Sequence, residues 1–115
     1  MANAMLIQLP AAQGFGSDED FDLRTQLERE LGLALAAEGA GECGRGEIED
    51  GHMSVRVEAV ADPVHTLRAV KDVLARMKLL PRASVVLETR CEADPDDIDR
   101  RVLWPLHHAA PARVA

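Results

Sequence analysis

The sequence contains few aromatic residues and few cysteines. Its 115 residues include two Phe, one Trp and no Tyr, so the core must be built from aliphatic side chains. The two cysteines, Cys43 and Cys91, stand far apart and form no C-x-x-C motif. This excludes a disulfide framework and predicts two reduced thiols, as is usual in the cytoplasm. Whether either thiol has a redox role is left open.

Long apolar runs are also missing. No stretch approaches the ~20 apolar residues that a membrane-spanning helix needs. The first ten residues, MANAMLIQLP, lack the basic region and the long apolar region of a signal peptide. We therefore expect a cytoplasmic protein that has no membrane partner.

Basic residues are scarce in the first half of the chain, so the formal net charge of −7 is unevenly distributed. Residues 1–50 hold eleven Asp and Glu against three Arg, whereas residues 51–115 hold nine acidic and ten basic residues. An acidic half repels phosphate groups, and few rings are present on which bases could stack. We expect no nucleic acid as a partner and instead a protein partner of basic character.

Apolar runs and alternating patterns predict the strands. The run at 5–9 is short, apolar and ended by a proline, while 53–60 and 83–90 alternate apolar with polar residues. The glycine-rich segment supplies one more strand at about 41–48. Val86 points away from its apolar neighbours, which predicts a second sheet face that is partly buried.

Helix starts are marked by acidic residues and by Asp-Pro pairs. Leucines at intervals of four follow the acidic stretch 17–22 and predict a helix that ends at Gly32 or continues to Glu38. Asp62 and Pro63 are a typical N-cap and first helical residue for a helix over 63–79. A second Asp-Pro pair predicts a short helix or turn over 93–102.

The segment GAGECGRGEIEDG, residues 39–51, contains a G-x-G-x-x-G pattern. A dinucleotide-binding loop needs a strand before its glycines and a helix after them. Here a helix precedes and a strand follows, and the neighbouring charges are mostly acidic. We predict that residues 39–46 bind no nucleotide and form an irregular or bulged strand, followed by a hairpin turn at Asp50 and Gly51. Whether 39–46 is a regular strand is left open.

Candidate reactive side chains do not fall into a catalytic or metal-binding pattern. A zinc site of Cys43, Cys91, His52 and an acidic residue would use ligands that zinc accepts, but these residues have no paired ligand spacing. The acidic neighbours of Cys43 raise its pKa and argue against a nucleophile. The other histidines are His65, at a helix start, and His107 with His108, in the tail. We assign no catalytic, cofactor-binding or metal-binding residue, and no cofactor.

The predicted order of elements is β-α-β-β-α-β. It predicts an α+β fold, a ferredoxin-like sandwich with a four-stranded antiparallel sheet and two helices on one face. Residues 1–106 form a single domain, and 107–115 form a flexible C-terminal tail. Trp104 covers the core or the sheet edge, or else joins a subunit interface; we favour the first role.

The segment GEIEDGHMSVRVEAVADPVHTLRAVKDVLARMKLLPRASVVL carries a resemblance to known proteins. Over about residues 41–90 the chain resembles small, mostly uncharacterised bacterial ferredoxin-like α/β domains, some of them immunity-like or regulatory. This resemblance implies a binding role, and it transfers no catalytic or binding residue.

We therefore expect a non-enzymatic protein-interaction or regulatory module. The alternative is a small enzyme or a small-ligand-sensing domain whose pocket forms between the sheet and a partner subunit, with His52, His65 or Cys43 converging on it. A modest core favours association, so we predict a homodimer with residues 98–106 near its interface.

Overall fold

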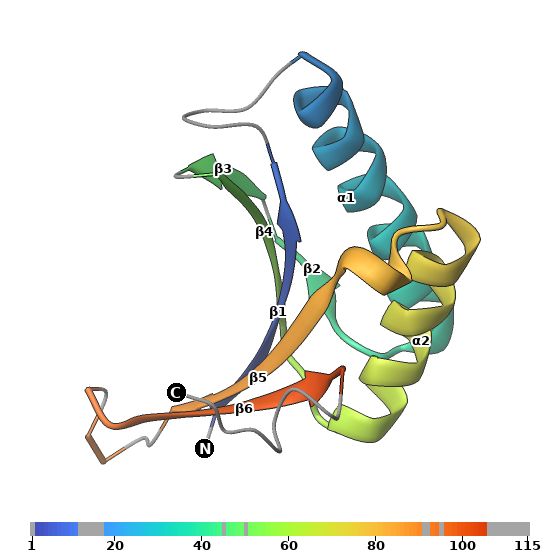
Figure 1. Cartoon of the computed structure of the whole chain (residues 1–115). Coiled ribbons are helices and arrows are strands. Elements are labelled where there is room, and N and C mark those ends of the chain that lie inside the picture. Colours follow the sequence, from blue (N-terminus) through green and yellow to red (C-terminus); the bar gives the residue numbers. More distant parts are fainter. Residues whose placement is uncertain are drawn as a thin grey trace.

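The computed structural model describes residues 2–11, 18–44, 46–49, 51–90, 93–94 and 96–105. In this part of the chain two α-helices pack on a six-stranded antiparallel sheet that is not closed. Figure 1 shows both helices on one side of the sheet and shows the sheet curved, so that its other face is concave. The α+β class is as the sequence predicts.

The sheet is built around β1. The strands are β1 (Ala2–Pro10), β2 (Glu42–Cys43), β3 (Glu47–Glu49), β4 (His52–Glu58), β5 (Ser84–Arg90) and β6 (Ile98–Trp104). Their order is β2-β4-β1-β5-β6, and β3 also pairs with β4. The two short strands β2 and β3 thus follow one another along the same side of β4, and β6 forms the opposite edge.

Both helices begin with favourable charges or caps. In α1 (Asp18–Glu38) three acidic residues lie in the first turn, and the helix continues through Gly32, the longer of the two predicted extents. In α2 (Pro63–Arg76) the Asp62 carboxylate accepts hydrogen bonds from the backbone N–H groups of Val64 and His65 at 3.1 and 3.4 Å. This confirms Asp62 as the N-cap. A 3₁₀ turn, η1 (Leu80–Arg82), precedes β5.

The core lies between the sheet and the helices and is aliphatic, as the lack of aromatic residues requires. Alternate residues of each strand point into it, together with one stripe of each helix. Its fully buried larger side chains are Met5, Ile7, Leu9, Leu27, Leu31, Leu35, Met53, Val55, Val57, Val70, Val73, Leu74 and Val85.

Two predictions about the sheet are wrong. The sheet has six strands, not four, and 98–104 is strand β6, where the sequence predicted a short helix or turn. The chain does turn at Asp94, whose carbonyl accepts a hydrogen bond from the N–H of Asp97 at 2.9 Å. The following residues then pair with the free edge of β5 instead of starting a helix.

The glycine-rich segment forms an interrupted strand that ends in a hairpin. Residues 41–48 supply β2 and part of β3, with a break between them. In the β3–β4 hairpin Glu49 pairs with His52. Gly51 has φ of +79°, a conformation that glycine adopts readily. The predicted hairpin is therefore confirmed. The predicted tail, residues 107–115, lies outside the described residues.

Candidate functional site

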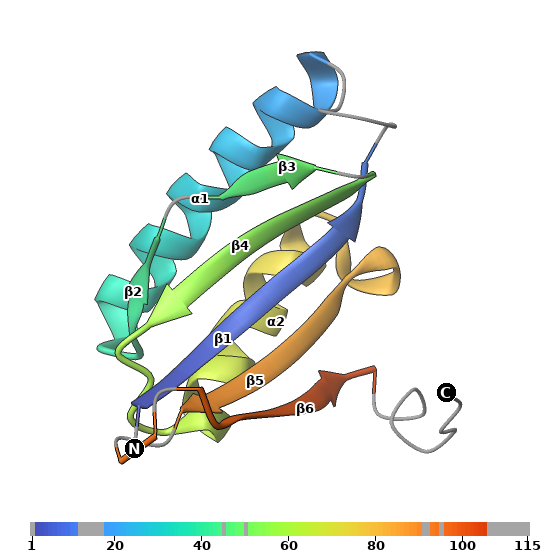
Figure 2. The same ribbon diagram turned by 90° about the vertical axis from the view of Figure 1, so that its left-hand side faces the viewer.

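The concave face of the sheet has an apolar centre. Leu6 of β1, Val86 of β5 and Val102 of β6 are half-buried and lie opposite one another on neighbouring strands. Figure 2 looks onto this face, behind which the helices lie. No helix of the described residues covers it. The partial burial predicted for Val86 is confirmed.

A charged cluster adjoins the apolar centre and is organised around Glu88 of β5. Glu88 is only 3% exposed, although it lies on the face that no described helix covers. Its carboxylate accepts hydrogen bonds from Arg56 Nη2 at 2.6 Å and from Arg100 Nε at 3.2 Å, and Arg90 Nη2 lies 3.8 Å away. Arg56 also pairs with Glu58 on its own strand. We call these five residues the Glu88 cluster.

The strand register explains how Arg56 reaches Glu88. The two residues lie on β4 and β5, with β1 between them. Ala4 of β1 stands directly opposite Glu88, and its small side chain leaves room for the guanidinium to cross the central strand. A small cavity of about 40 Å³ remains there, lined in part by Ala4, Arg56 and Glu88.

Arg56 and Glu88 keep their charges at neutral pH. The hydrogen bond from Arg56 lowers the pKa of Glu88, outweighing the opposite effect of burial, and Arg100 lowers it further. The same hydrogen bond raises the pKa of Arg56. Neither group is therefore poised to exchange a proton near neutral pH, so the cluster is suited to fixing side chains and binding, not to acid–base catalysis.

The glycine-rich edge is sealed by α1. Between β2 and β3 the carbonyl of Gly46 accepts a hydrogen bond from Arg24 Nη1 at 3.1 Å, and its N–H donates to the Glu28 carboxylate. A Cβ on Gly46 would come within 2.8 Å of Glu28 Oε2. The glycine therefore allows a close approach of backbone to helix, which is a structural role and not that of a phosphate loop.

Cys43 is not an activated nucleophile. Burial and, to a smaller extent, the charge of Glu28 raise the pKa of its thiol to about 11, so the thiolate is rare at neutral pH. The direction agrees with the sequence prediction, but burial is the larger cause. Among the described residues no group of three His, Cys, Asp or Glu is placed to hold a metal ion. Cys91, His107 and His108 lie outside those residues.

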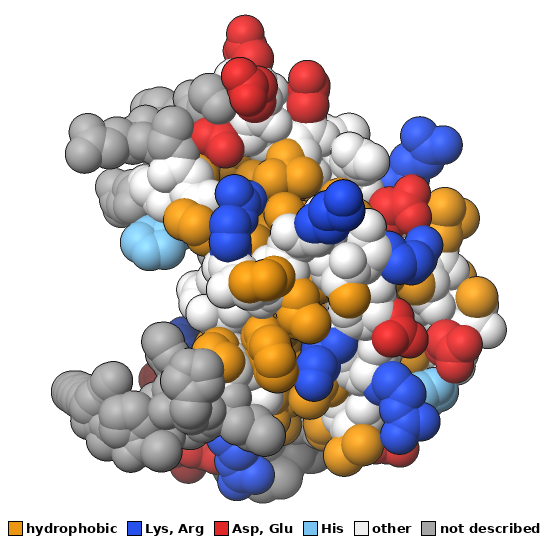
Figure 3. Space-filling model, turned by 45° about the vertical axis from the view of Figure 1, so that its right-hand side comes forward, with side chains coloured by type: hydrophobic (Ala, Val, Ile, Leu, Met, Phe, Trp, Pro, Cys, Tyr) orange, Lys and Arg blue, Asp and Glu red, His pale blue; other side chains and the backbone are white. Residues whose placement is uncertain are grey.

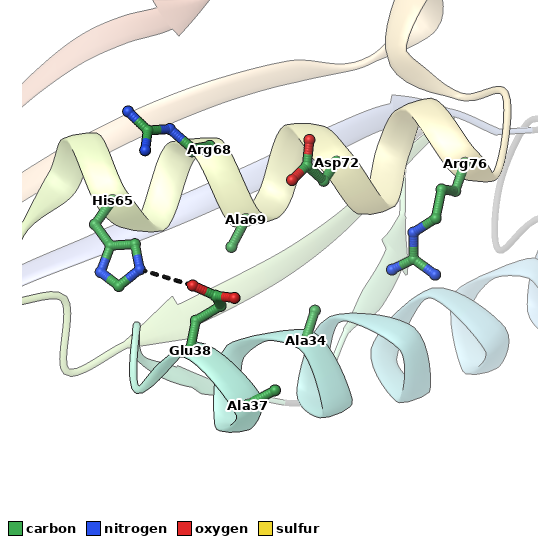
Figure 4. A pocket seen from close by; sticks show the side chains of 8 residues that line it. All are labelled: Ala34, Ala37, Glu38, His65, Arg68, Ala69, Asp72 and Arg76. Carbon is green, nitrogen blue, oxygen red and sulfur yellow. Dashed lines mark hydrogen bonds and ion pairs between the residues drawn. The ribbon is translucent and has the colours of Figure 1, made fainter.

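A shallow groove of about 300 Å³ runs between α1 and α2. Figure 4 shows His65 of α2 pointing toward Glu38 of α1 at one end, with Ala34 and Ala69 facing across the groove. His65 Nε2 lies 3.1 Å from Glu38 Oε1. The described residues that line the groove belong to α1 and α2, so His65 lies in it and His52 and Cys43 do not.

Trp104 packs within its own chain. A register shift between Val85 and Val86 places Trp104 opposite Val85, on the helix side of the sheet. Its indole N–H donates to the carbonyl of Leu80 at 3.1 Å, and Lys71 Nζ lies 4.3 Å from the ring centroid. Trp104 thus covers the sheet edge, the role that the sequence analysis favours.

Acidic side chains gather at the end of the molecule where α1 begins, as Figure 3 shows. On the concave face the strands β2, β3 and β4 add Glu42, Glu47 and Glu58, which are all exposed. Arg90 and Arg100 lie on the opposite side of this face, on β5 and β6. The two sides of the concave face therefore differ in charge.

Comparison with protein-family models, with curated protein sequences and with solved structures found no match to this chain. In the part of the chain that is described, no helix is both long enough and apolar enough to cross a membrane.

The sequence analysis missed the Glu88 cluster. Arg56 and Glu88 occupy polar positions in two strands whose sequences alternate apolar with polar residues, and this pattern is the signal that could have indicated them. Pairing them across the sheet, however, required knowing that β4 and β5 flank the same strand, and Arg100 required β6 to be a strand.

Proposed function

We propose that the fold is a ferredoxin-like sandwich with one additional edge strand. The strand order supports this if β2 and β3 are counted as one interrupted strand, because β1 then lies between β4 and β5 as in two interlocked β-α-β units. The strand β6 is the addition.

We further propose that this protein is a non-enzymatic, regulatory protein-binding module that acts as a homodimer. The observation that carries this proposal is the half-buried apolar row Leu6, Val86 and Val102 on a concave face that no described helix covers. A sheet face of this kind is either solvated and polar or covered by another surface. The hydrogen-bonded Glu88 cluster beside it gives that surface a fixed shape.

The charge and curvature of the face support a basic, convex partner segment. Glu42, Glu47 and Glu58 line one side and are exposed, so a helix or loop that carries Lys or Arg would find complementary charges there. Its apolar side chains would rest on Leu6 and Val86. Rim charges of this kind chiefly set the rate and selectivity of association, while the apolar centre supplies most of the affinity.

The experiment is a pull-down from the native host with mass spectrometry, comparing the wild-type protein with Leu6→Asp and with Leu33→Asp. Leu33 lies on α1 and is 62% exposed, so its variant carries the same chemical change away from the concave face. We expect a basic partner protein that the wild type and Leu33→Asp retain and Leu6→Asp loses.

A second pair of variants tests the charge. Replacing both Glu42 and Glu47 by Lys should weaken capture of the same partner and reduce its dependence on salt. Equal capture by the Leu6→Asp and Leu33→Asp variants would contradict the proposed surface. The absence of any reproducible partner, together with a robust turnover activity, would overturn the binding function itself.

A further inference from the structure

The two edges of the sheet differ in their availability for pairing. At one edge β2 and β3 are short and interrupted, and α1 takes up backbone groups of Gly46 through Arg24 and Glu28. At the other edge β6 is seven residues long and, among the described strands, pairs with β5 alone. Figure 2 shows β6 running along this edge with no described strand beyond it. A strand of this length presents unpaired backbone groups to another strand.

We propose that two copies of this chain pair antiparallel along β6, so that the two sheets become one continuous sheet, in the register that places Arg100 opposite the partner subunit's Arg100. This inference rests on the homodimer of the proposed function and specifies its contact. The occupant of the edge is a second copy because the sequence IDRRVLW is complementary to itself in that register.

Symmetry limits the possible registers. In a continuous sheet with a twofold axis perpendicular to it, each residue must oppose one that points to the same face. Within β6, Ile98, Arg100 and Val102 lie on the concave side, opposite Arg90, Glu88 and Val86, while Asp99 and Arg101 point to the helix side. A symmetric register must therefore place one residue of β6 directly opposite its own copy in the partner subunit, and we say that the register is centred on that residue.

The register centred on Arg100 matches its neighbours best. It places Asp99 opposite the partner subunit's Arg101, twice by symmetry, and Ile98 opposite the partner subunit's Val102, also twice. Opposite charges and apolar pairs that face each other across strands are each stabilising. A register centred on Asp99 would oppose two carboxylates and place Ile98 against an arginine. One centred on Arg101 would oppose two arginines and place Arg100 against a valine.

Each arginine of the central pair is already hydrogen-bonded within its own chain to the Glu88 carboxylate, which it shares with Arg56. Arg100 Nε lies 3.2 Å from Glu88 Oε2, so two guanidinium groups and two carboxylates would meet near the axis. The same run of charges, Asp99 to Arg101, discourages pairing with unrelated strands, because other edges would not oppose each charge with its opposite. The paired sheets would join two concave faces side by side and give a partner a longer surface.

Charge reversal tests the contact. Asp99 and Arg101 are exposed and oppose Thr89 and Leu87 within the chain, so their variants should fold normally. Asp99→Arg alone or Arg101→Asp alone turns two attractive pairs into two repulsive ones, which should raise the dissociation constant of the dimer at least about tenfold. The double variant Asp99→Arg with Arg101→Asp restores opposite charges and should restore the dimer, measured by light scattering across a concentration series.

Cross-linking tests the register. In a background with Cys43→Ser and Cys91→Ser, Arg100→Cys should form an intermolecular disulfide under mild oxidation. Residues directly opposed in an antiparallel pair are about 4.5–5.5 Å apart at Cα, within the range of a disulfide. Arg101→Cys is the control, used at a protein concentration where light scattering shows both variants to be dimers, because its copies would be diagonal neighbours roughly 7–8 Å apart and should cross-link far more slowly.

The outcomes separate the inference from the function. A wild-type dimer that survives both single charge reversals, or that cross-links no faster through Arg100→Cys than through Arg101→Cys, overturns the β6 contact and leaves the homodimer standing. A wild-type protein that is monomeric at high micromolar concentration overturns the homodimer and the contact together. Binding of a partner through Leu6 is decided separately by the pull-down.

Discussion

Replacing Glu88 by Gln removes the negative charge at the centre of the Glu88 cluster and keeps the side chain's shape. The carboxylate accepts from Arg56 at 2.6 Å and from Arg100 at 3.2 Å while being only 3% exposed. The amide of the variant offers one acceptor and would turn N–H donors toward a guanidinium. The change therefore leaves cationic donors without an acceptor.

The loss of stability expected for Glu88→Gln follows from these contacts. A hydrogen bond to a charged group contributes about 1.5–3 kcal/mol. The side chains of Arg56 and Arg100 are 34% and 67% exposed, so water can replace part of what they lose. We expect a decrease of about 2 kcal/mol in the free energy of unfolding, or roughly 8 °C in Tm for a domain of this size.

The matched control is Glu58→Gln, which removes a carboxylate from the same Arg56. The side chain of Glu58 is 55% exposed, and exposed ion pairs contribute about 0–1 kcal/mol. Urea unfolding of both variants at pH 7 measures the difference. A Glu88→Gln variant that loses no more stability than Glu58→Gln would refute the reasoning that burial of Glu88 makes its pairs stabilising.

The stability difference between the wild type and Glu88→Gln should also depend on pH. The pKa of Glu88 is lowered in the folded state, so its contribution is fully present above the unfolded pKa of about 4.3 and is lost as the pH falls through the folded value. The stability difference between the wild type and Glu88→Gln should be constant from about pH 6 to pH 8 and should shrink below about pH 4. A difference that grows on acidification would contradict the sign.

Three further predictions concern the glycines and Cys43. Gly46→Ala should cost about 1–3 kcal/mol because its Cβ would overlap α1, whereas Gly32→Ala, which has open space and a helical backbone, should stabilise by about 0.5–1 kcal/mol; equal effects in urea unfolding would contradict the close approach. In a Cys91→Ser background, Cys43 should react with iodoacetamide only slowly at pH 8 and faster toward pH 11, since its pKa is about 11; a rate that is already at its plateau at pH 8 would contradict the burial. Titration with ATP or NAD should show no binding to residues 39–46, and saturable binding that Gly41→Val abolishes would refute this.

The helices and the inner strands could be predicted from the sequence because their signals are local. Asp62 followed by Pro63 begins α2 through a cap that involves only neighbouring residues. Alternation of apolar residues marks β4, and an Asp-Gly pair marks its hairpin. These patterns depend on the backbone periods of helices and strands, so they need no knowledge of what lies beside them.

The position of β6 could not be predicted, because its pattern becomes meaningful only beside β5. The charges at 99–101 interrupt the apolar alternation, and Arg100 makes sense in a strand only when Glu88 lies across from it. The register shift that turns Trp104 to the helix side likewise depends on the pairing of β5 with β6.

The sequence by itself determined the α+β class, the aliphatic core, both helix starts and the hairpin, since each follows from residue type and short-range periodicity. The tertiary structure alone decided the features that join distant segments: the Glu88 cluster across β4, β5 and β6, the contact of Gly46 with Arg24 and Glu28, and the burial that is the larger cause of the raised pKa of Cys43. The physical reason is that burial and charge pairing depend on which strands become neighbours. The strand order is set by how the whole chain packs, and no local pattern encodes it.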